Sequence, residues 1–225
     1  MLWVGTVQGL NRYNPNNGKF ARFKNIPENP NSLSHNYIYT GIIEDRKGNL
    51  WVGTIGGGLN KLDIENKTFK SYQNIPGNTE SLSDNMVFWI YEDIEGFIWV
   101  ATNTKLCRLD PETEKFKRFG LSEGLPNEVV YGILPDEENS IWLSTNYGLC
   151  RFNLKDYATK NYDINDGLQS NEFNGGALHL GKSGKLYFGG VYGLNIIDPK
   201  ELNITKKRSR KLSSQELRFS VMKLR

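Results

Sequence analysis

The chain has 225 residues, a net charge of +3 and 38% hydrophobic residues, which is enough for one large domain. The charge is uneven: residues 206–225 carry +7, which leaves −4 for the rest, so the overall charge says little about the partners of the folded part. No run of about 18 apolar residues is present, which argues against a membrane-spanning helix in this sequence.

One segment, centred on an aromatic residue in a short strand-like pattern such as LWVGT, recurs along the chain. The aromatic anchors are Trp3, Trp51, Trp99, Trp142 and Tyr187, spaced by 48, 48, 43 and 45 residues. A fixed period in the forties built from short strands is typical of a β-propeller. The sequence therefore predicts an all-β fold made of repeated blades.

The second copy of the repeat shows the strands that we expect in each blade. We predict an inner strand over residues 37–45, followed by the Asp-x-x-Gly turn DRKGN, which leads into LWVGT. GLNKLD is the third strand, and after the polar turn DIENKT the segment FKSY is the outermost. We expect blades of four antiparallel strands.

The same reading divides the chain into residues 1–200 and a basic C-terminal tail, residues 201–225. The first part would hold a partial blade, three full blades and a final three-strand blade, about four to five blades in all. Propellers close with about four to eight blades, so a closed five-unit ring is one alternative. We favour an open arc of a larger ring. The tail segment 217–224 alternates in polarity and is a candidate for the missing outer strand.

Four long connections, residues 25–36, 74–85, 120–128 and 163–174, are rich in Asn, Pro, Gly and Ser, and are expected on one face. Their ends, with nearby turns, give the candidate ligand-binding residues: His35, Asn36, Tyr37, Asp84, Asn85, Trp89, Asn127, Glu128, Tyr147, Asn171, Glu172, Asn174 and Tyr192. Such side chains can hydrogen-bond hydroxyl groups and stack on sugar faces. The alternative is that Asn and Asp cap turns through backbone groups.

Trp51, Trp99 and Trp142 share one strand phase, which favours packing between blades over ligand stacking. Trp89 lies off that phase, in MVFWIYED, and is a candidate to approach the central channel. Cys107 and Cys150 occupy the same repeat position on different blades, so we expect two buried free thiols rather than a disulfide.

No catalytic residue, cofactor or metal site is predicted. His35 and His179 lie in different contexts, without a nearby nucleophile signature. The carboxylate pairs Glu44–Asp45 and Glu92–Asp93 adjoin turns, so capping explains them better than glycoside hydrolysis. The basic run at residues 206–211 could contact phosphates, but a solvated tail explains it better, and no nucleic-acid partner is expected.

The pattern DxxGxLWVGTxxGLxRxD, with SLSxN connections, resembles the two-component regulator propeller repeat from Leu2 to about Pro199. The last unit, with FGG in place of VGT, is similar to the final propeller repeat in sensors of hybrid two-component systems. The resemblance implies a non-enzymatic, ligand-sensing segment of a seven-bladed propeller that responds to glycan-type ligands. It also implies a periplasmic parent with a histidine kinase and a membrane anchor in regions absent here.

Partners expected on this basis are an oligosaccharide and a second copy, the latter as a homodimer or through unpaired blade edges. Met1 leads directly into a strand without a signal peptide, so this sequence expressed as it stands is expected in the cytoplasm. Two alternatives remain open. One is a propeller enzyme, either streptogramin-lyase-like or glycan-cleaving, and the other is an inactive truncated remnant.

Overall fold

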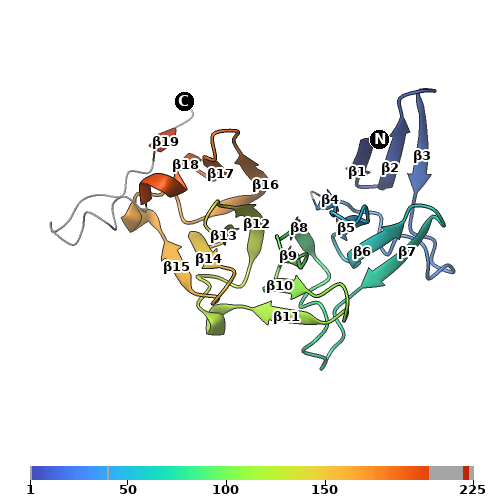
Figure 1. The fold of residues 1–225 in the computed structure, drawn as a ribbon, viewed down its shortest axis with the longest axis horizontal. Helices are drawn as coiled ribbons and strands as arrows, with labels where there is room; N and C mark the ends of the chain where they lie inside the picture. Colours follow the sequence, from blue (N-terminus) through green and yellow to red (C-terminus); the bar gives the residue numbers. More distant parts are fainter. Residues whose placement is uncertain (1, 40, 203–219, 223–225) are drawn as a thin grey trace. The chain divides into compact units, whose positions relative to one another are not determined.

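The computed structural model describes residues 2–39, 41–202 and 220–222. These residues form five antiparallel sheets of three or four strands, with only short helical turns (Figure 1). The predicted all-β fold with propeller-type sheets is confirmed. The chain divides into two compact units, Met1–Gly120 and Leu121–Arg225.

The first unit holds three sheets. The first sheet consists of β1 (Leu2–Thr6), β2 (Gly9–Asn14) and β3 (Lys19–Phe23). The second consists of β4 (Ile42–Glu44), β5 (Leu50–Thr54), β6 (Gly58–Asp63) and β7 (Thr68–Tyr72). The third consists of β8 (Val87–Glu92), β9 (Ile98–Thr102), β10 (Leu106–Leu109) and β11 (Phe116–Phe119). Strands follow one another in chain order, as short turns between antiparallel neighbours require.

The second unit holds two sheets of four strands. The fourth sheet has β12 (Val130–Pro135), β13 (Ser140–Thr145), β14 (Leu149–Asn153) and β15 (Thr159–Tyr162). The fifth has β16 (Phe173–Leu180), β17 (Leu186–Gly190), β18 (Gly193–Ile197) and β19 (Ser220–Met222). The short 3-10 helices η1 (Leu121–Glu123) and η2 (Ile164–Asp166) lie in the connections before β12 and β16.

The last sheet differs from the three-strand blade expected from the sequence. β19 pairs antiparallel with β18, so the sheet has four strands. Three residues of the proposed edge segment 217–224 are described, and they occupy the expected outer position. The free hydrogen-bonding groups along β18 explain the pairing, because an open strand edge accepts a further strand. Residues 203–219 and 223–225 of the tail lie outside the described residues.

Each sheet has two faces, which we name by their residues in the central strand. The tryptophan face carries Trp3 in the first sheet and its equivalents Trp51, Trp99, Trp142 and Tyr187 in the others. The valine face carries Val4 and its equivalents Val52, Val100, Leu143 and Phe188. In the first unit Trp3, Leu10 and Phe23 pack on Val52, Leu62 and Phe69 of the second sheet. A tryptophan face therefore packs on the valine face of the next sheet.

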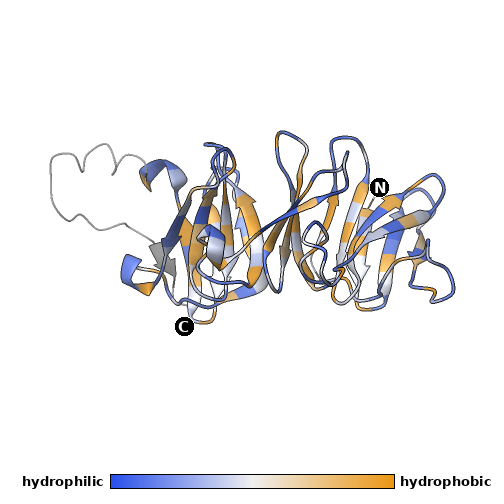
Figure 2. Ribbon diagram, turned by 90° about the horizontal axis from the view of Figure 1, so that it is seen from below, coloured by the Kyte–Doolittle hydropathy of each residue, from blue (hydrophilic) through white to orange (hydrophobic). Residues whose placement is uncertain are grey.

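Two further interfaces follow this rule. Trp51, Leu59 and Tyr72 pack on Val100, Leu109 and Phe116 of the third sheet. In the second unit Trp142, Leu149 and Tyr162 pack on Leu186, Phe188 and Ile197. Figure 2 shows the apolar colour along the strands and the polar colour in the connections. Because alternate residues of a strand point to opposite faces, the central strands must be apolar on both.

The tryptophans are held by the Asp-x-x-Gly turns. Trp51, Trp99 and Trp142 are fully buried, which confirms their predicted place in the core. Their indole Nε1 groups donate to Asp45, Asp93 and Asp136 at 2.8, 2.7 and 3.1 Å. The same three carboxylates accept two backbone N–H groups of their own turns. One side chain thus closes the turn and satisfies a buried donor.

The two cysteines are buried free thiols, as predicted. Cys107 Sγ lies 3.1 Å from Ser83 Oγ. Among the described residues, no helix is long and apolar enough to cross a membrane.

Candidate functional site

Each long connection ends in a pair of polar residues, and the first of each pair caps the chain that follows. The N–H two residues further on donates to His35 Nδ1, Asp84 Oδ1, Asn127 Oδ1 or Ser170 Oγ, at 2.7–3.2 Å. These bonds turn the backbone into the next inner strand. Asp84 and Asn127 therefore make the kind of hydrogen bond that turn capping requires, and His35 makes the same kind of contact.

The side chain of the second residue of each pair accepts a hydrogen bond from a backbone N–H near the start of the same connection. Asn36 and Asn85 accept from the N–H groups of Asn25 and Asn74 at 2.8 and 2.7 Å. In the second unit Glu128 and Asn171 accept from the N–H groups of residues 121 and 164, at 3.3 and 2.9 Å. One oxygen of each side chain therefore holds the loop. Ligand binding by these residues stays a prediction.

In the first unit the turn at residues 55–58 joins two of these loop ends. The N–H of Ile55 donates to the carbonyl of Tyr37 at 2.8 Å, and the N–H groups of Gly56 and Gly58 donate to the carbonyl of Asn85 at 2.9 Å each. A Cβ on Gly57 would lie 2.6 Å from His35 Cβ, so only glycine lets the loops meet this closely. His35, Tyr37 and Asn85 therefore border one turn.

Tyr37 adds an exposed aromatic surface to this cluster. Its ring meets that of Tyr39 edge to face, with centroids 6.4 Å apart, and the two residues are 38% and 47% exposed. Trp89 is half-buried and pairs with Ala101 next to a bulge in β8. Its predicted approach to a central channel stays a prediction.

The second unit brings four predicted residues together. The N–H of Gly148 donates to the carbonyl of Asn171 at 2.6 Å, and that of Val191 donates to the carbonyl of Glu172 at 3.2 Å. These bonds place the turns that carry Tyr147 and Tyr192 beside the end of the connection. The two tyrosines are 52% and 72% exposed. We name Tyr147, Asn171, Glu172 and Tyr192 the tyrosine cluster. Asn174 is exposed and follows on β16.

Sequence reasoning missed Gln169, which ties the tyrosine cluster together. Its Oε1 accepts from the N–H of Tyr192 at 2.7 Å, and its own N–H donates to Asn195 Oδ1 at 3.1 Å. A Cβ on Gly190 would overlap the Gln169 amide, so the FGG variant of the repeat provides the space. The sequence does carry a signal for this contact. In the last repeat FGG replaces VGT, so glycine stands in place of threonine at residue 190, where the Gln169 side chain lies.

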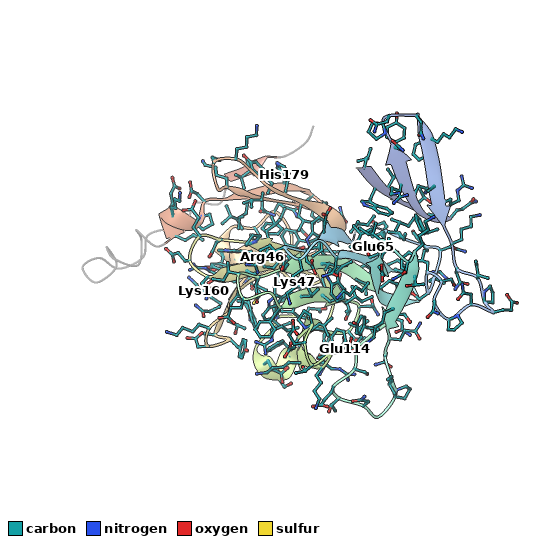
Figure 3. All side chains as sticks on the ribbon, turned by 45° about the vertical axis from the view of Figure 1, so that its right-hand side comes forward. Arg46, Lys47, Glu65, Glu114, Lys160 and His179 are labelled. Atoms are coloured by element: carbon teal, nitrogen blue, oxygen red, sulfur yellow. The ribbon has the colours of Figure 1, made fainter. Side chains whose placement is uncertain are left out.

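Burial works against activation of the two thiols. Burial raises the pKa of Cys150 to about 12, and burial also raises the pKa of Cys107 despite the opposing contact with Ser83. A reactive thiolate needs the opposite shift. His179 lies on β16 with its ring 6.1 Å from that of Tyr187 (Figure 3). Within the described ranges, no group of three His, Cys, Asp or Glu side chains is placed to hold a metal ion.

These features define a repeat-built β-propeller segment with exposed aromatic and polar groups at its loop ends. Residues 32–56, 81–104 and 124–147 match the model of the two-component regulator propeller family. The chain therefore carries repeats of the two-component regulator propeller family. No curated protein sequence matches it.

Among solved structures the chain is similar to extracellular domains from B. thetaiotaomicron. One is assigned to the hybrid two-component system BT3049, with a TM-score of 0.75 and 22% identity over 88% of this chain. Another, BT4673, is assigned to a one-component system, with a TM-score of 0.75 and 23% identity over 88% of this chain. The chain spans 27% and 28% of those two structures.

The fold is also similar to virginiamycin B lyase from Staphylococcus aureus. The TM-score is 0.63 and the identity 16%, over 88% of this chain and 63% of the lyase. At these identities the likenesses establish a shared fold, whereas function depends on the site.

Proposed function

We propose that the chain is the ligand-sensing part of a two-component signal-transduction sensor, acting in the periplasm and binding a glycan-type ligand without chemical turnover. The family repeats and the similar extracellular domains support the sensor role and the compartment. The observation that carries the ligand class is the tyrosine cluster. There, the turns that carry the exposed Tyr147 and Tyr192 are hydrogen-bonded to the backbone carbonyls of Asn171 and Glu172.

This arrangement suits a sugar, because a sugar has both apolar ring faces and polar hydroxyl groups, and the cluster offers aromatic rings and polar side chains. A tyrosine ring packs on the apolar face of a pyranose, while carboxylate and amide groups bond its hydroxyls. The turns hold the tyrosine backbones through the bonds of Gly148 and Val191, so little backbone freedom is lost on binding. A change in how the propeller packs against the rest of the sensor would then be the signal.

The test is isothermal titration calorimetry of the full chain against a panel of oligosaccharides, with mass spectrometry of the ligand afterwards. We expect saturable binding of at least one oligosaccharide, recovered intact. Tyr147→Ala and Tyr192→Ala should each weaken that binding about tenfold, or about 1.4 kcal/mol, which lies at the upper end of the 0.5–1.5 kcal/mol typical of an aromatic contact.

The matched control is Leu180→Ala, which removes exposed apolar surface at the far end of β16. It lies seven residues from Phe173, or roughly 23 Å at the usual rise per strand residue. Equal weakening in the control and tyrosine variants would refute the cluster as the site. Ligand that returns cleaved, with the same dependence on the tyrosines, would instead favour an enzyme.

A further inference from the structure

Glu172 stands at a repeat position where the other connections carry no charge. The residue that follows the loop-closing side chain is Tyr37, Met86 or Val129 in the earlier connections. The backbone role of this position is shared. The carbonyls of Tyr37, Met86 and Glu172 each accept a hydrogen bond, at 2.8–3.2 Å, from the first residue after a central strand. The fold therefore uses the carbonyl of Glu172 and has no need of its carboxylate.

The carboxylate of Glu172 is also not neutralised by a neighbouring cation. The residue is exposed, and within the described residues of the second unit no ion pair joins it to a Lys or Arg side chain. At the opposite end of the fourth sheet, by contrast, Asp136 and Glu138 pair with Arg151 at 2.9 and 3.0 Å. The negative charge of Glu172 thus remains available to a ligand.

The chain segments around the tyrosine cluster carry acidic groups and no basic ones. The connection 163–174 contains Asp163 and Asp166 besides Glu172, and neither it nor the turns at residues 145–148 and 190–193 contain Lys or Arg. Burial first, and then the nearby carboxylate of Glu172, raise the pKa of Tyr131 on β12. A ligand that enters the cluster therefore meets a negative potential, which favours a positive charge on the ligand.

The aromatic groups of the cluster favour the same sign of charge. A tyrosine ring attracts a cation placed over its face, and a carboxylate attracts an ammonium group while it repels a second carboxylate or a sulfate. Tyr147 and Tyr192 are exposed, on turns hydrogen-bonded to the carbonyls of Asn171 and Glu172. A sugar with a free amine offers both the apolar ring face and the positive charge that these groups can bind.

We propose that the tyrosine cluster selects glycans that carry protonated amines, such as oligosaccharides of glucosamine, and that Glu172 determines this selectivity. Glycans built from uronic acids or sulfated sugars present the same kind of ring with the opposite charge, and the cluster disfavours them. This inference rests on the proposed function, because it names the charge of the ligand that the same site would take.

The test is isothermal titration calorimetry of the full chain at about pH 5.5, where amines are protonated and carboxylates remain ionised. The probes are a glucosamine oligosaccharide, its N-acetylated counterpart of equal length, which keeps the rings and loses the charges, and an oligogalacturonate. We expect the glucosamine oligosaccharide to bind about tenfold more tightly than the N-acetylated form, and the oligogalacturonate to bind more weakly than either. The preference should shrink when NaCl is raised from about 20 to 500 mM, because salt screens exposed charges.

The matched variants are Glu172→Gln and Glu137→Gln. Glu172→Gln removes the charge and keeps the size of the side chain, so it should abolish most of the tenfold preference. Glu137→Gln changes the net charge by the same amount at an exposed turn, at the other end of β13 from Tyr147, and should retain the preference.

The outcomes separate this inference from the proposed function. Equal binding of the glucosamine and N-acetylated forms, tighter binding of the oligogalacturonate, or a full preference in Glu172→Gln would overturn the inference and leave glycan sensing in place. Saturable binding confined to oligosaccharides without amines would do the same. Absence of saturable binding to every oligosaccharide would refute the proposed function itself, and this inference with it.

Discussion

Replacing Asp45 by alanine should destabilise the second sheet more than an exposed turn residue ordinarily would. The carboxylate accepts from the N–H groups of Lys47 and Asn49 at 3.0 and 2.8 Å, and from Trp51 Nε1 at 2.8 Å. The two backbone donors lie in a turn that water reaches. The indole N–H belongs to a residue with no exposed surface, so it cannot find a substitute.

The magnitude follows from that difference. An unpaired buried donor costs about 1–3 kcal/mol, and the two turn bonds contribute about 1 kcal/mol together after water replaces them. We expect Asp45→Ala to lower the free energy of unfolding by about 3 kcal/mol. Asp45→Asn, which keeps one acceptor oxygen, should cost roughly a third as much.

The assay is equilibrium urea unfolding followed by tryptophan fluorescence, repeated in a Trp51→Phe background. If the indole bond matters as described, the loss caused by Asp45→Ala should shrink by about 1–2 kcal/mol once the donor is gone. Identical losses in both backgrounds would refute the account, because they would assign the whole effect to the turn.

The hydrogen bonds of Asp45 also predict that the stability of the chain depends on pH. Burial alone would raise the pKa of Asp45, but hydrogen bonds from Trp51, Asn49 and Lys47 together lower it below the ordinary value of 3.8. A lowered pKa in the folded state gives stability that is complete above pH 3.8 and is lost as the pH falls through the folded-state pKa. The difference between wild type and Asp45→Asn should therefore narrow below about pH 4.

Two further predictions concern the repeat itself. Gly58→Ala should lower the free energy of unfolding by about 2 kcal/mol or more, because φ is +74° and a Cβ would overlap the Tyr72 carbonyl. Gly18 also has a positive φ, +68°, but nothing lies near its Cβ position, so Gly18→Ala should cost about 1 kcal/mol in the same urea assay. Cys150, whose pKa burial raises to about 12, should resist thiol reagents at pH 8 in the native chain and react once unfolded; rapid modification of the folded chain would contradict its burial.

The fold could be predicted from the sequence because equivalent positions of the repeats can be compared with one another. Trp51, Trp99 and Trp142 at one phase predicted inter-sheet packing, and the structure buries all three. The hydrogen bond from the indole to the aspartate was not predicted, although an aspartate lies six residues before each of these tryptophans. Its signal lies in the last repeat, where Gly181 replaces the aspartate and Tyr187 replaces the tryptophan. The donor and its acceptor are lost together.

The site was less readable because one residue type serves two roles. Asn36, Asn85 and Asn171 looked like ligand contacts, and the structure uses an oxygen of each to close a loop. A side chain required by every repeat is required by the fold. Composition alone cannot separate these roles, since capping and sugar binding both use amides and carboxylates.

Positions that differ between repeats are therefore better guides to ligand binding than positions that recur. Tyr147 and Tyr192 each stand two residues after the end of a central strand. Gln8, Gly56 and Thr104 hold that place in the other sheets. No packing rule of the repeat calls for an aromatic there, and both rings are mostly in solvent. A large apolar group kept in water at a turn is costly for solubility unless something binds it. By this reasoning the second unit, rather than the first, should dominate recognition, and loss of binding in Tyr147→Ala and Tyr192→Ala should exceed that in Tyr37→Ala.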